Sequence, residues 1–361
     1  MSAAIQEKFD AWLTDSGPAA LVIREHLTPV EGRDGVIFPS TFAKSQDGSF
    51  AGGYNIDSFS ETENVCLIDS VGSQANRIEP LFTKPNYADL VPKITVKAGE
   101  KVVNLLDAGH RAGDAIVRCS ALQEELQAAF KSVQNGDAEP LAKIAPTSLV
   151  FGVWDSRDTG TKLPRLLAST IRAFNVRELR RSAQYIPAAD YVSDGLLNEA
   201  ADKKTSDAYA VRGFVHIPAS GTPGGVIAMG GIRRDASLHL AALRLLFATS
   251  ATKTVALRRY ILGLALTAFT YPPAGYLRQG CNLVLDPDKP RDFVEVHSDG
   301  RRVPANVTSS EALEYARATA GDFGVGKNVA VDFDTERAKK DISGDSNGDR
   351  KGKKSRGKSA E

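Results

Sequence analysis

Arginine and lysine occur in three stretches of the sequence together with small residues and side-chain amides, a combination suited to binding phosphate. The first stretch is DSVGSQANRIE (69–79), in which a short polar turn leads into a predicted helix. Backbone N–H groups and the dipole at the start of a helix favour anions. The opening turn presents Ser73, Gln74, Asn76 and Arg77, which are candidate phosphate contacts. The alternative is an ordinary N-cap at Ser73 with solvated polar neighbours.

The second stretch, WDSRDTGTKLPRLLASTIRAFNVRELRR (154–181), holds seven bases and three acids. Lys162, Arg165, Ser169 and Arg172 recur at spacings of three or four residues, which predicts one face of a helix. Leucine and isoleucine fall on a different side of that helix. A basic stripe opposite an apolar one suits a helix that lies over a sheet and faces a phosphate backbone. Exposed bases on an ordinary amphipathic helix are the alternative.

The third stretch is the block 236–285, which contains five bases and no acid, taken together with its flanks. Its flanks are MGGIRRD (229–235) and GYLRQGCN (275–282). Glycine lets a ligand approach the backbone closely. The bidentate phosphate donors in these flanks are Arg233, Arg234 and Arg278.

Established catalytic motifs are absent from the sequence. There is no GxGxxG behind a strand, no Walker lysine loop, no HExxH and no GxSxG. None of the five histidines pairs with Cys or Asp at ligand spacing, so we predict no metal site and no cofactor. His110 near Asp114 has the residue types for acid–base chemistry, and Asp69 and Asp155 lie at predicted strand ends. A structural role is favoured for each, so we predict no catalytic residue and a protein that is not an enzyme.

Cysteine usage and hydropathy indicate the compartment. Cys66, Cys119 and Cys281 are too few and too scattered for a disulfide framework, which favours a reducing cytoplasm. The N-terminus has no secretory signal pattern. The longest uncharged apolar stretch, 260–277, is interrupted by two prolines, and this favours a buried helix over a membrane span. We expect a cytoplasmic protein with no membrane partner.

Charge is segregated along the chain although the net charge is only +1. Residues 1–100 carry 14 acids and 8 bases, whereas residues 337–361 carry nine bases and four acids. Acidic and basic faces can bind a polyanion or each other. Residues 337–361 are rich in Gly, Ser and Lys, so we predict a disordered basic tail that either holds nucleic acid weakly or merely aids solubility.

Predicted strands and helices mix irregularly over the folded part, 1–336, which favours an α+β fold. Weakly patterned segments at 31–64 and 190–210 interrupt it and are expected to carry function or to protrude. The predicted strands are 21–30, 65–70, 147–156, 212–218, 281–286 and 292–303 with a turn at 298–300. The predicted helices are 73–82, 106–133, 162–174, a long stretch from 238 to 269, and 309–321 with Ser310 as N-cap and Gly321 as its stop.

The order and spacing of five stretches resemble one family. The stretches are DSVGSQANRIE (69–79), HRAGDAIVR (110–118), PTSLVFGVWDSRDTGTKLPRLLASTIRAFNV (146–176), SAQYIPAADY (182–191) and YLRQGCNLV (276–284). From about residue 20 to about residue 330, the sequence resembles the RAMP-superfamily backbone subunit (Cas-seven-like) of the type I-G, formerly I-U, CRISPR Cascade surveillance complex.

This resemblance implies an RRM-like (ferredoxin-like) antiparallel core sheet with large finger and thumb insertions. It also implies a non-catalytic subunit whose copies stack head to tail along the spacer of a crRNA. The further partners would be the target DNA strand paired to the guide and other Cascade subunits. The RNA-binding residues carried over or nominated are Ser73, Gln74, Asn76, Arg77, Arg111, Arg157, Lys162, Arg165, Ser169, Arg172, Arg233, Arg234 and Arg278.

The sequence departs from RRM proteins that read RNA by stacking, because the strand 65–70 has no aromatic residue and 212–218 has only Phe214. Contacts to phosphate, with base edges left for pairing, fit the residues better and would accept any spacer sequence. The alternative function is a ribonuclease of the same superfamily that processes or cleaves RNA, with His110 or an Asp in the active role.

Overall fold

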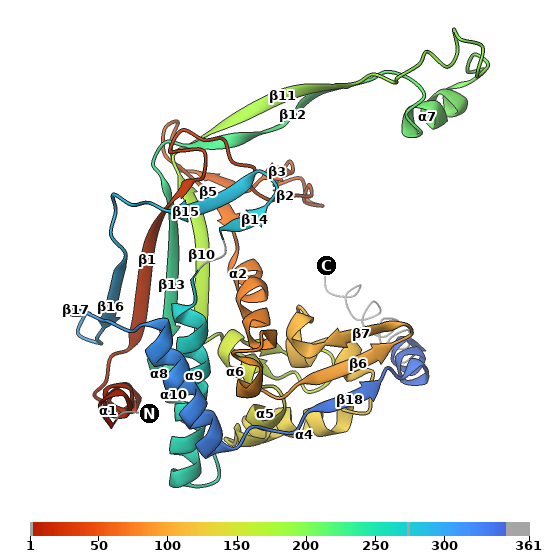
Figure 1. The fold of residues 1–361 in the computed structure, drawn as a ribbon. Helices are drawn as coiled ribbons and strands as arrows, with labels where there is room; N and C mark the ends of the chain where they lie inside the picture. Colours follow the sequence, from red (N-terminus) through yellow and green to blue (C-terminus); the bar gives the residue numbers. More distant parts are fainter. Residues whose placement is uncertain (1–2, 273–274, 344–361) are drawn as a thin grey trace, which may run out of the picture.

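A curled antiparallel sheet of nine strands forms the centre of the protein (Figure 1). The structure is a computed structural model that describes residues 3–272 and 275–343. The sheet runs β14 (Tyr276–Arg278), β15 (Cys281–Leu285), β1 (Ala20–Pro29), β13 (Ile232–His239), β10 (Leu167–Phe174), β5 (Asn64–Asp69) and β4 (Ile56–Ser58), while β16 (Asp292–Val296) pairs with β1 and β17 (Arg302–Pro304) with β16. The predicted α+β class is confirmed.

Side-chain alternation gives this sheet two different faces. In β1, Leu21, Ile23 and Leu27 are buried on one face, whereas Arg24 and His26 lie on the other. Helices cover the apolar face over its lower half (Figure 1). They are α8 (Leu240–Leu243), α9 (Ala251–Thr270), α10 (Ser309–Phe323), α2 (Val71–Ile78) and α6 (Pro146–Phe151).

The helices α9 and α10 pack closely because small residues meet at their crossing. A Cβ at Gly263 of α9 would lie 2.8 Å from the Cα of Ala316 and 2.8 Å from Oγ1 of Thr319 in α10. Around this crossing, Tyr260 stacks on Phe323 with ring centroids 4.6 Å apart. The helix α9 is buried between the sheet and α10. This burial explains why the acid-free block 236–285 is so apolar over α9.

A second lobe lies beside the helices (Figure 1). Its sheet joins β18 (Val329–Asp332) in parallel to β6 (Ile94–Ala98), which pairs with β7 (Lys101–Asn104). Short helices pack around this sheet: α3 (Ala115–Arg118), α4 (Gln123–Gln134), α5 (Glu139–Ile144) and the 3-10 turns η2 (Glu79–Thr83), η3 (Ala88–Leu90), η4 (Leu105–Asp107) and η5 (Arg111–Gly113). The remaining small elements are α1 (Ala3–Asp10), η1 (Ala11–Leu13), and the hairpins β2 (Thr41–Phe42) with β3 (Gly53–Tyr54) and β8 (Val153–Trp154) with β9 (Lys162–Leu163).

A long two-stranded arm projects from the sheet (Figure 1). It consists of β11 (Val176–Tyr185) and β12 (Ile217–Ala228), and α7 (Lys203–Val211) lies near its end. The weakly patterned segment 190–210 thus protrudes, as expected. At the base of the arm, Ile37 exchanges backbone hydrogen bonds with Val226 (3.0 and 2.8 Å), and the Phe38 N–H donates to the Gly280 carbonyl (2.8 Å).

Several predicted elements are wrong. Residues 162–174 form β9 and β10 rather than a helix, and the apolar run 147–156 holds α6 and β8 rather than a strand. The predicted helix 106–133 is broken into turns and α4, and the stretch 238–269 into α8 and α9. The last helix begins after Thr308, which forms a capping box with Glu311, and ends at Gly324 rather than Gly321.

The first residues of the predicted tail, 337–343, belong to a helical segment. Residues 335–343 are helical. Arg337 donates to the Ser120 carbonyl (2.8 Å), and Asp341 accepts from Arg118 (2.6 Å). These contacts fasten the segment to the second lobe, and the rest of the predicted tail lies outside the described residues. Among the described helices, none has the length and apolar character needed to cross a membrane.

We predict opposite effects of alanine at two helical glycines. Gly263→Ala forces a Cβ against the backbone of α10 and should destabilise the protein by about 1–3 kcal/mol. Gly321→Ala is the matched control, because a Cβ there meets nothing within 4 Å and alanine favours helix; it should stabilise by up to about 1 kcal/mol. Urea unfolding measures both. Equal effects of the two substitutions would contradict the close packing of α9 on α10.

Candidate nucleic-acid interface

The end of β5 and the start of α2 meet at Asp69, whose side chain is fully buried. Ser70 caps the helix, its Oγ accepting the Ser73 backbone N–H (3.2 Å). Asp69 Oδ2 accepts from Gln74 Nε2 (2.7 Å) and from Arg77 Nε (3.0 Å). Its Oδ1 accepts from Arg278 Nη2 (3.1 Å), and Arg278 Nη1 donates to the Ile68 carbonyl (3.0 Å). One carboxylate therefore joins three of the predicted site residues.

The hydrogen-bonded chain continues from Gln74 across the sheet. Ser169 of β10 donates to Gln74 Oε1 (2.9 Å), and Arg234 of β13 reaches the Ser169 hydroxyl (3.5 Å). Arg234 Nε also donates to Glu25 Oε2 (2.6 Å), and Arg291 pairs with the other oxygen of Glu25 (3.3 Å). We call this set of eight residues the Asp69–Glu25 network. Its members are Glu25, Asp69, Gln74, Arg77, Ser169, Arg234, Arg278 and Arg291.

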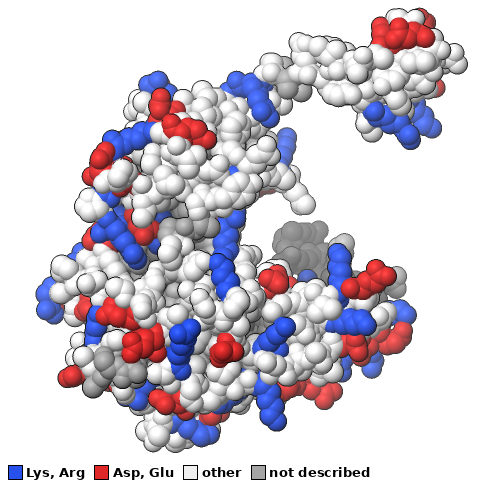
Figure 2. All heavy atoms as spheres, in the orientation of Figure 1, with Lys and Arg blue, Asp and Glu red and all other residues white. Residues whose placement is uncertain are grey.

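Cations outnumber carboxylates in the Asp69–Glu25 network, with four arginines against two acids. The two acids and Arg234 are buried, whereas the side chains of Arg77 and Arg278 are 33% and 24% exposed. Each carboxylate is paired with two arginines, so one surplus positive charge reaches solvent at Arg77 and Arg278 beside Asp69, and another at Arg291 (37% exposed) beside Glu25. Figure 2 shows basic side chains on the wall of the hollow between the arm and the second lobe, over the region of α2.

Burial corrects the predicted roles of Gln74, Ser169 and Arg234. All three lie inside the network, where they cannot contact a bound strand. They hold the exposed arginines in place instead. Within the first stretch, Asn76 and Arg77 are exposed and remain candidate contacts, and Ser73 lies half-buried at the helix start.

Arg111, another of the predicted RNA contacts, is likewise buried. Its Nε lies 2.6 Å from Glu79 Oε2, and its Nη1 donates to the Gly152 carbonyl (3.3 Å). Burial raises the pKa of Glu79 to about 7, because removal from water disfavours the carboxylate more than Arg111 favours it. Arg111 Nη2 reaches Asn76 Oδ1 (3.5 Å), so the buried Glu79–Arg111 pair also contacts α2.

Gly152 connects this pair to the β8–β9 hairpin. A Cβ at Gly152 would lie 2.9 Å from Cγ of Arg165, which places the exposed Arg165 beside Arg111. In the hairpin, Trp154 lies opposite Lys162, whose Nζ is 5.4 Å from the indole centroid. Trp154 is 61% exposed, and sequence reasoning did not nominate it. Arg157 lies exposed in the loop of the same hairpin.

Arg172 and Arg233 lie on the other face of the sheet, so the predicted single helical stripe is wrong. Because residues 167–174 form a strand, Ser169 and Arg172 point to opposite faces. Arg172 is the cross-strand partner of Arg233, which donates to Asp235 (2.9 Å) and lies over the Phe174 ring (4.7 Å). These two arginines form a surface separate from the Asp69–Glu25 network.

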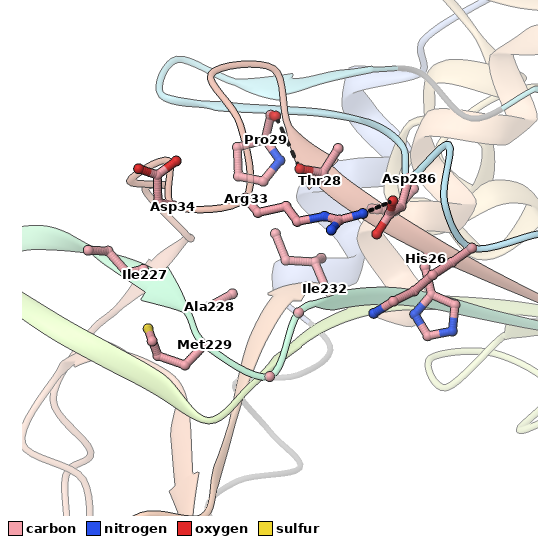
Figure 3. A pocket seen from close by; sticks show the side chains of 14 residues that line it. His26, Thr28, Pro29, Arg33, Asp34, Ile227, Ala228, Met229, Ile232 and Asp286 are labelled. Atoms are coloured by element: carbon pink, nitrogen blue, oxygen red, sulfur yellow. Dashed lines mark hydrogen bonds and ion pairs between the residues drawn. The ribbon is translucent and has the colours of Figure 1, made fainter.

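A pocket of about 380 Å³ lies beside this second surface (Figure 3). It is lined by the end of β1 and by the turn between β12 and β13. Arg33 reaches across it and donates to Asp286 (2.8 Å), while Met229 and Ile232 line its apolar side. Burial and the nearby cations Lys289 and Arg233 lower the pKa of His26 in its wall. No predicted site residue lines this pocket, and its charges are balanced, so it is poorly suited to a run of phosphates.

The chemistry of the described residues offers few reactive groups. Among residues 3–272 and 275–343, no cluster of three or more His, Cys, Asp or Glu is arranged to hold a metal ion. Burial raises the pKa of the Cys66 thiol to about 12 and that of Cys281 to about 11, so both thiols stay protonated near neutral pH. The Asp69 carboxylate is enclosed by its three donors and is inaccessible to a substrate.

Comparison with known proteins gives a family match over part of the chain. The family model described as CRISPR-associated protein GSU0053 (Cas_GSU0053) matches residues 21–178, less than half of the chain. The matched segment includes Asp69, all of α2 and β10, but ends before β13 and β14. The match indicates a CRISPR-associated protein and supports a role in CRISPR defence. No curated protein matches the chain.

We predict that Arg111 stabilises the fold. Arg111→Met leaves the buried Glu79 without its cation and should lower the free energy of unfolding by about 3–5 kcal/mol in chemical denaturation. The double variant Glu79→Leu, Arg111→Met removes both charges and should recover most of that loss. A loss below about 1 kcal/mol in the single variant would contradict the structural role.

Proposed function

We propose that the chain is a non-catalytic subunit that holds crRNA in a type I CRISPR surveillance complex, of the subtype I-G suggested by the resemblance. The observation that carries this proposal is the excess of arginine over carboxylate around Asp69, which comes to the surface at Arg77 and Arg278. The exposed Arg165 and Lys162 extend this basic surface. Arg165 lies beside Gly152, and the buried Arg111 links Gly152 to Asn76 of α2. The single family match supports the CRISPR setting.

The topology supports an RRM-like core. Along the chain, β1, β10, β13 and β16 are the first to fourth strands of this core, and their order in the sheet is β16–β1–β13–β10. The helix α9 connects β13 to the segment that returns through β15 to β16. This is the arrangement of a β-α-β-β-α-β ferredoxin-like unit. The arm is then an insertion between the second and third strands of the core.

The arm suits a contact with a neighbouring subunit. It extends away from the body (Figure 1), and its stem carries the exposed Arg177, Arg180 and Arg181. We assign it the role of the thumb that reaches over the guide held by the next copy. Copies related by one such contact build an open head-to-tail array, because the contact joins two different surfaces. The target DNA strand and other Cascade subunits are further partners in this proposal.

The mechanism is retention of the guide by its backbone. Guanidinium groups bind phosphate oxygens in a bidentate manner, and contacts to phosphate carry no sequence information. The bases of the guide therefore remain available to pair with target DNA, which carries the sequence specificity. Each neutralised phosphate releases counterions, so the affinity falls steeply as salt concentration rises.

Expression with a repeat-spacer transcript tests the proposal directly. The purified protein should carry RNA of uniform length. Incubation with labelled repeat-spacer RNA, with and without magnesium, should leave that RNA intact. Cleavage that disappears in His110→Ala would instead establish the ribonuclease alternative.

We predict that Arg77→Ala and Arg165→Ala each weaken RNA binding by a similar factor for unrelated spacer sequences. Loss of one phosphate contact should also reduce the slope of log K against log salt by roughly 0.7. Fluorescence anisotropy with two RNAs of different sequence measures both quantities. Arg302→Ala, at the far edge of the sheet on β17, is the matched charge control and should bind normally. A loss that depends strongly on spacer sequence would contradict phosphate gripping.

We predict that RNA changes the fluorescence of Trp154. The protein has two tryptophans, and Trp12 is 4% exposed whereas Trp154 is 61% exposed, so only Trp154 can stack on a base. Stacking is tolerant of sequence and is worth about 1–3 kcal/mol per base, so Trp154→Ala should weaken binding by that amount. Trp154→Phe should retain most of the affinity. A quenching signal that persists in Trp154→Ala would assign it to Trp12 and exclude stacking here.

A further inference from the structure

We propose that Asp69 is a positioning residue that aligns Arg77 and Arg278 on one phosphodiester of a single RNA strand. This inference rests on the proposed function and adds to it the residue that organises the contact. Arg77 comes from α2 and Arg278 from β14, and the Asp69 carboxylate is their shared partner. A carboxylate in a phosphate-binding surface is otherwise unfavourable, because it repels the ligand.

The geometry of the carboxylate leaves each arginine with one orientation. Asp69 Oδ2 is shared by Gln74 Nε2 and Arg77 Nε, and Oδ1 binds Arg278 Nη2. The carbonyl of Ile68 takes the second terminal nitrogen of Arg278 and fixes the plane of its guanidinium. Within the described part of the chain, the bond through Nε is the one hydrogen bond seen for Arg77, so its two terminal nitrogens remain for a ligand.

Burial makes this alignment rigid. The Asp69 side chain is fully buried, and charge-assisted hydrogen bonds in a low-dielectric site are short and strong. Gln74 is held in turn by the Ser169 hydroxyl (2.9 Å), so the carboxylate cannot rotate without breaking the chain of bonds across the sheet. The alignment is therefore present before RNA binds, which removes the cost of ordering two long side chains on binding.

The charge balance indicates the class of ligand. Around Asp69, two arginines face one carboxylate, and the surplus positive charge emerges at Arg77 and Arg278. A phosphodiester carries one negative charge and two oxygens that accept from guanidinium forks. It matches the paired, partly exposed arginines better than a neutral ligand does.

The sign of the effect of Asp69→Asn tests the inference. Removal of a negative charge beside a phosphate should strengthen binding if electrostatic attraction alone matters. Loss of alignment should weaken it instead, by about tenfold. The slope of log K against log salt should also fall, by roughly 0.7 for each arginine released. Anisotropy with an unstructured RNA at several salt concentrations measures both, and the slope does not respond to a merely smaller folded fraction.

Asp10→Asn is the matched control. Asp10 forms a comparable two-point pair with Arg259 (2.9 and 2.6 Å), and it lies on α1, away from α2 (Figure 1). The control removes the same charge and one arginine partner, and it should leave RNA affinity and salt slope unchanged. Wild-type affinity and slope in folded Asp69→Asn would overturn the inference while the proposed function stands.

Arg77→Lys decides the question if Asp69→Asn fails to fold. Lysine keeps the charge but has no fork with which to bind Asp69 and phosphate together. It should therefore bind RNA about tenfold more weakly than the wild type, and full affinity in this variant would also overturn the inference. Wild-type protein that binds no RNA at low salt would contradict the proposed function itself, and the inference would fall with it.

Discussion

A single buried carboxylate determines how Arg77 and Arg278 are arranged. Asp69 sits where β5 gives way to α2, and it is satisfied only by donors from α2 and from β14. An ionised group inside a protein is very costly without such partners. The need to satisfy this one charge therefore holds together the start of α2 and the edge hairpin β14–β15. Through Gln74 and Ser169 it also includes the central strand β10. The two arginines that do this, Arg77 and Arg278, also reach solvent.

Part of the sheet follows from the sequence, because several of its strands are short runs rich in Val, Ile and Leu. β1, β5, β15 and the β16–β17 hairpin lie within a residue or two of their predicted positions. The segment 162–174 was misassigned because basic residues happened to recur at helical spacing, while its short apolar run fits a strand equally well. The prediction of a strand at 147–156 is wrong because a buried helical turn and a buried strand have similar composition.

The candidate interface was predictable in part. Gln74, Arg77 and Arg278 do come together, although they are distant in the chain. Arg111 and Arg234 looked equivalent to them in the sequence but are buried against Glu79 and Glu25. Partner choice between distant acids and bases depends on tertiary packing, which residue spacing does not encode. Trp154 was missed, although a tryptophan next to the polar run DSRDTG is a signal of exposure.

The strap at residues 36–38 has a mechanical consequence. It is bonded to the base of the arm at Val226 and to Gly280, two residues beyond Arg278. A Cβ at Gly225 would collide with Val36 and one at Gly280 with Phe38, so the strap fits tightly on both sides. A load applied to the tip of the arm is therefore transmitted through this strap to the hairpin that bears Arg278. In the array proposed above, a pull on the arm by a neighbouring copy would therefore reach the hairpin that carries Arg278.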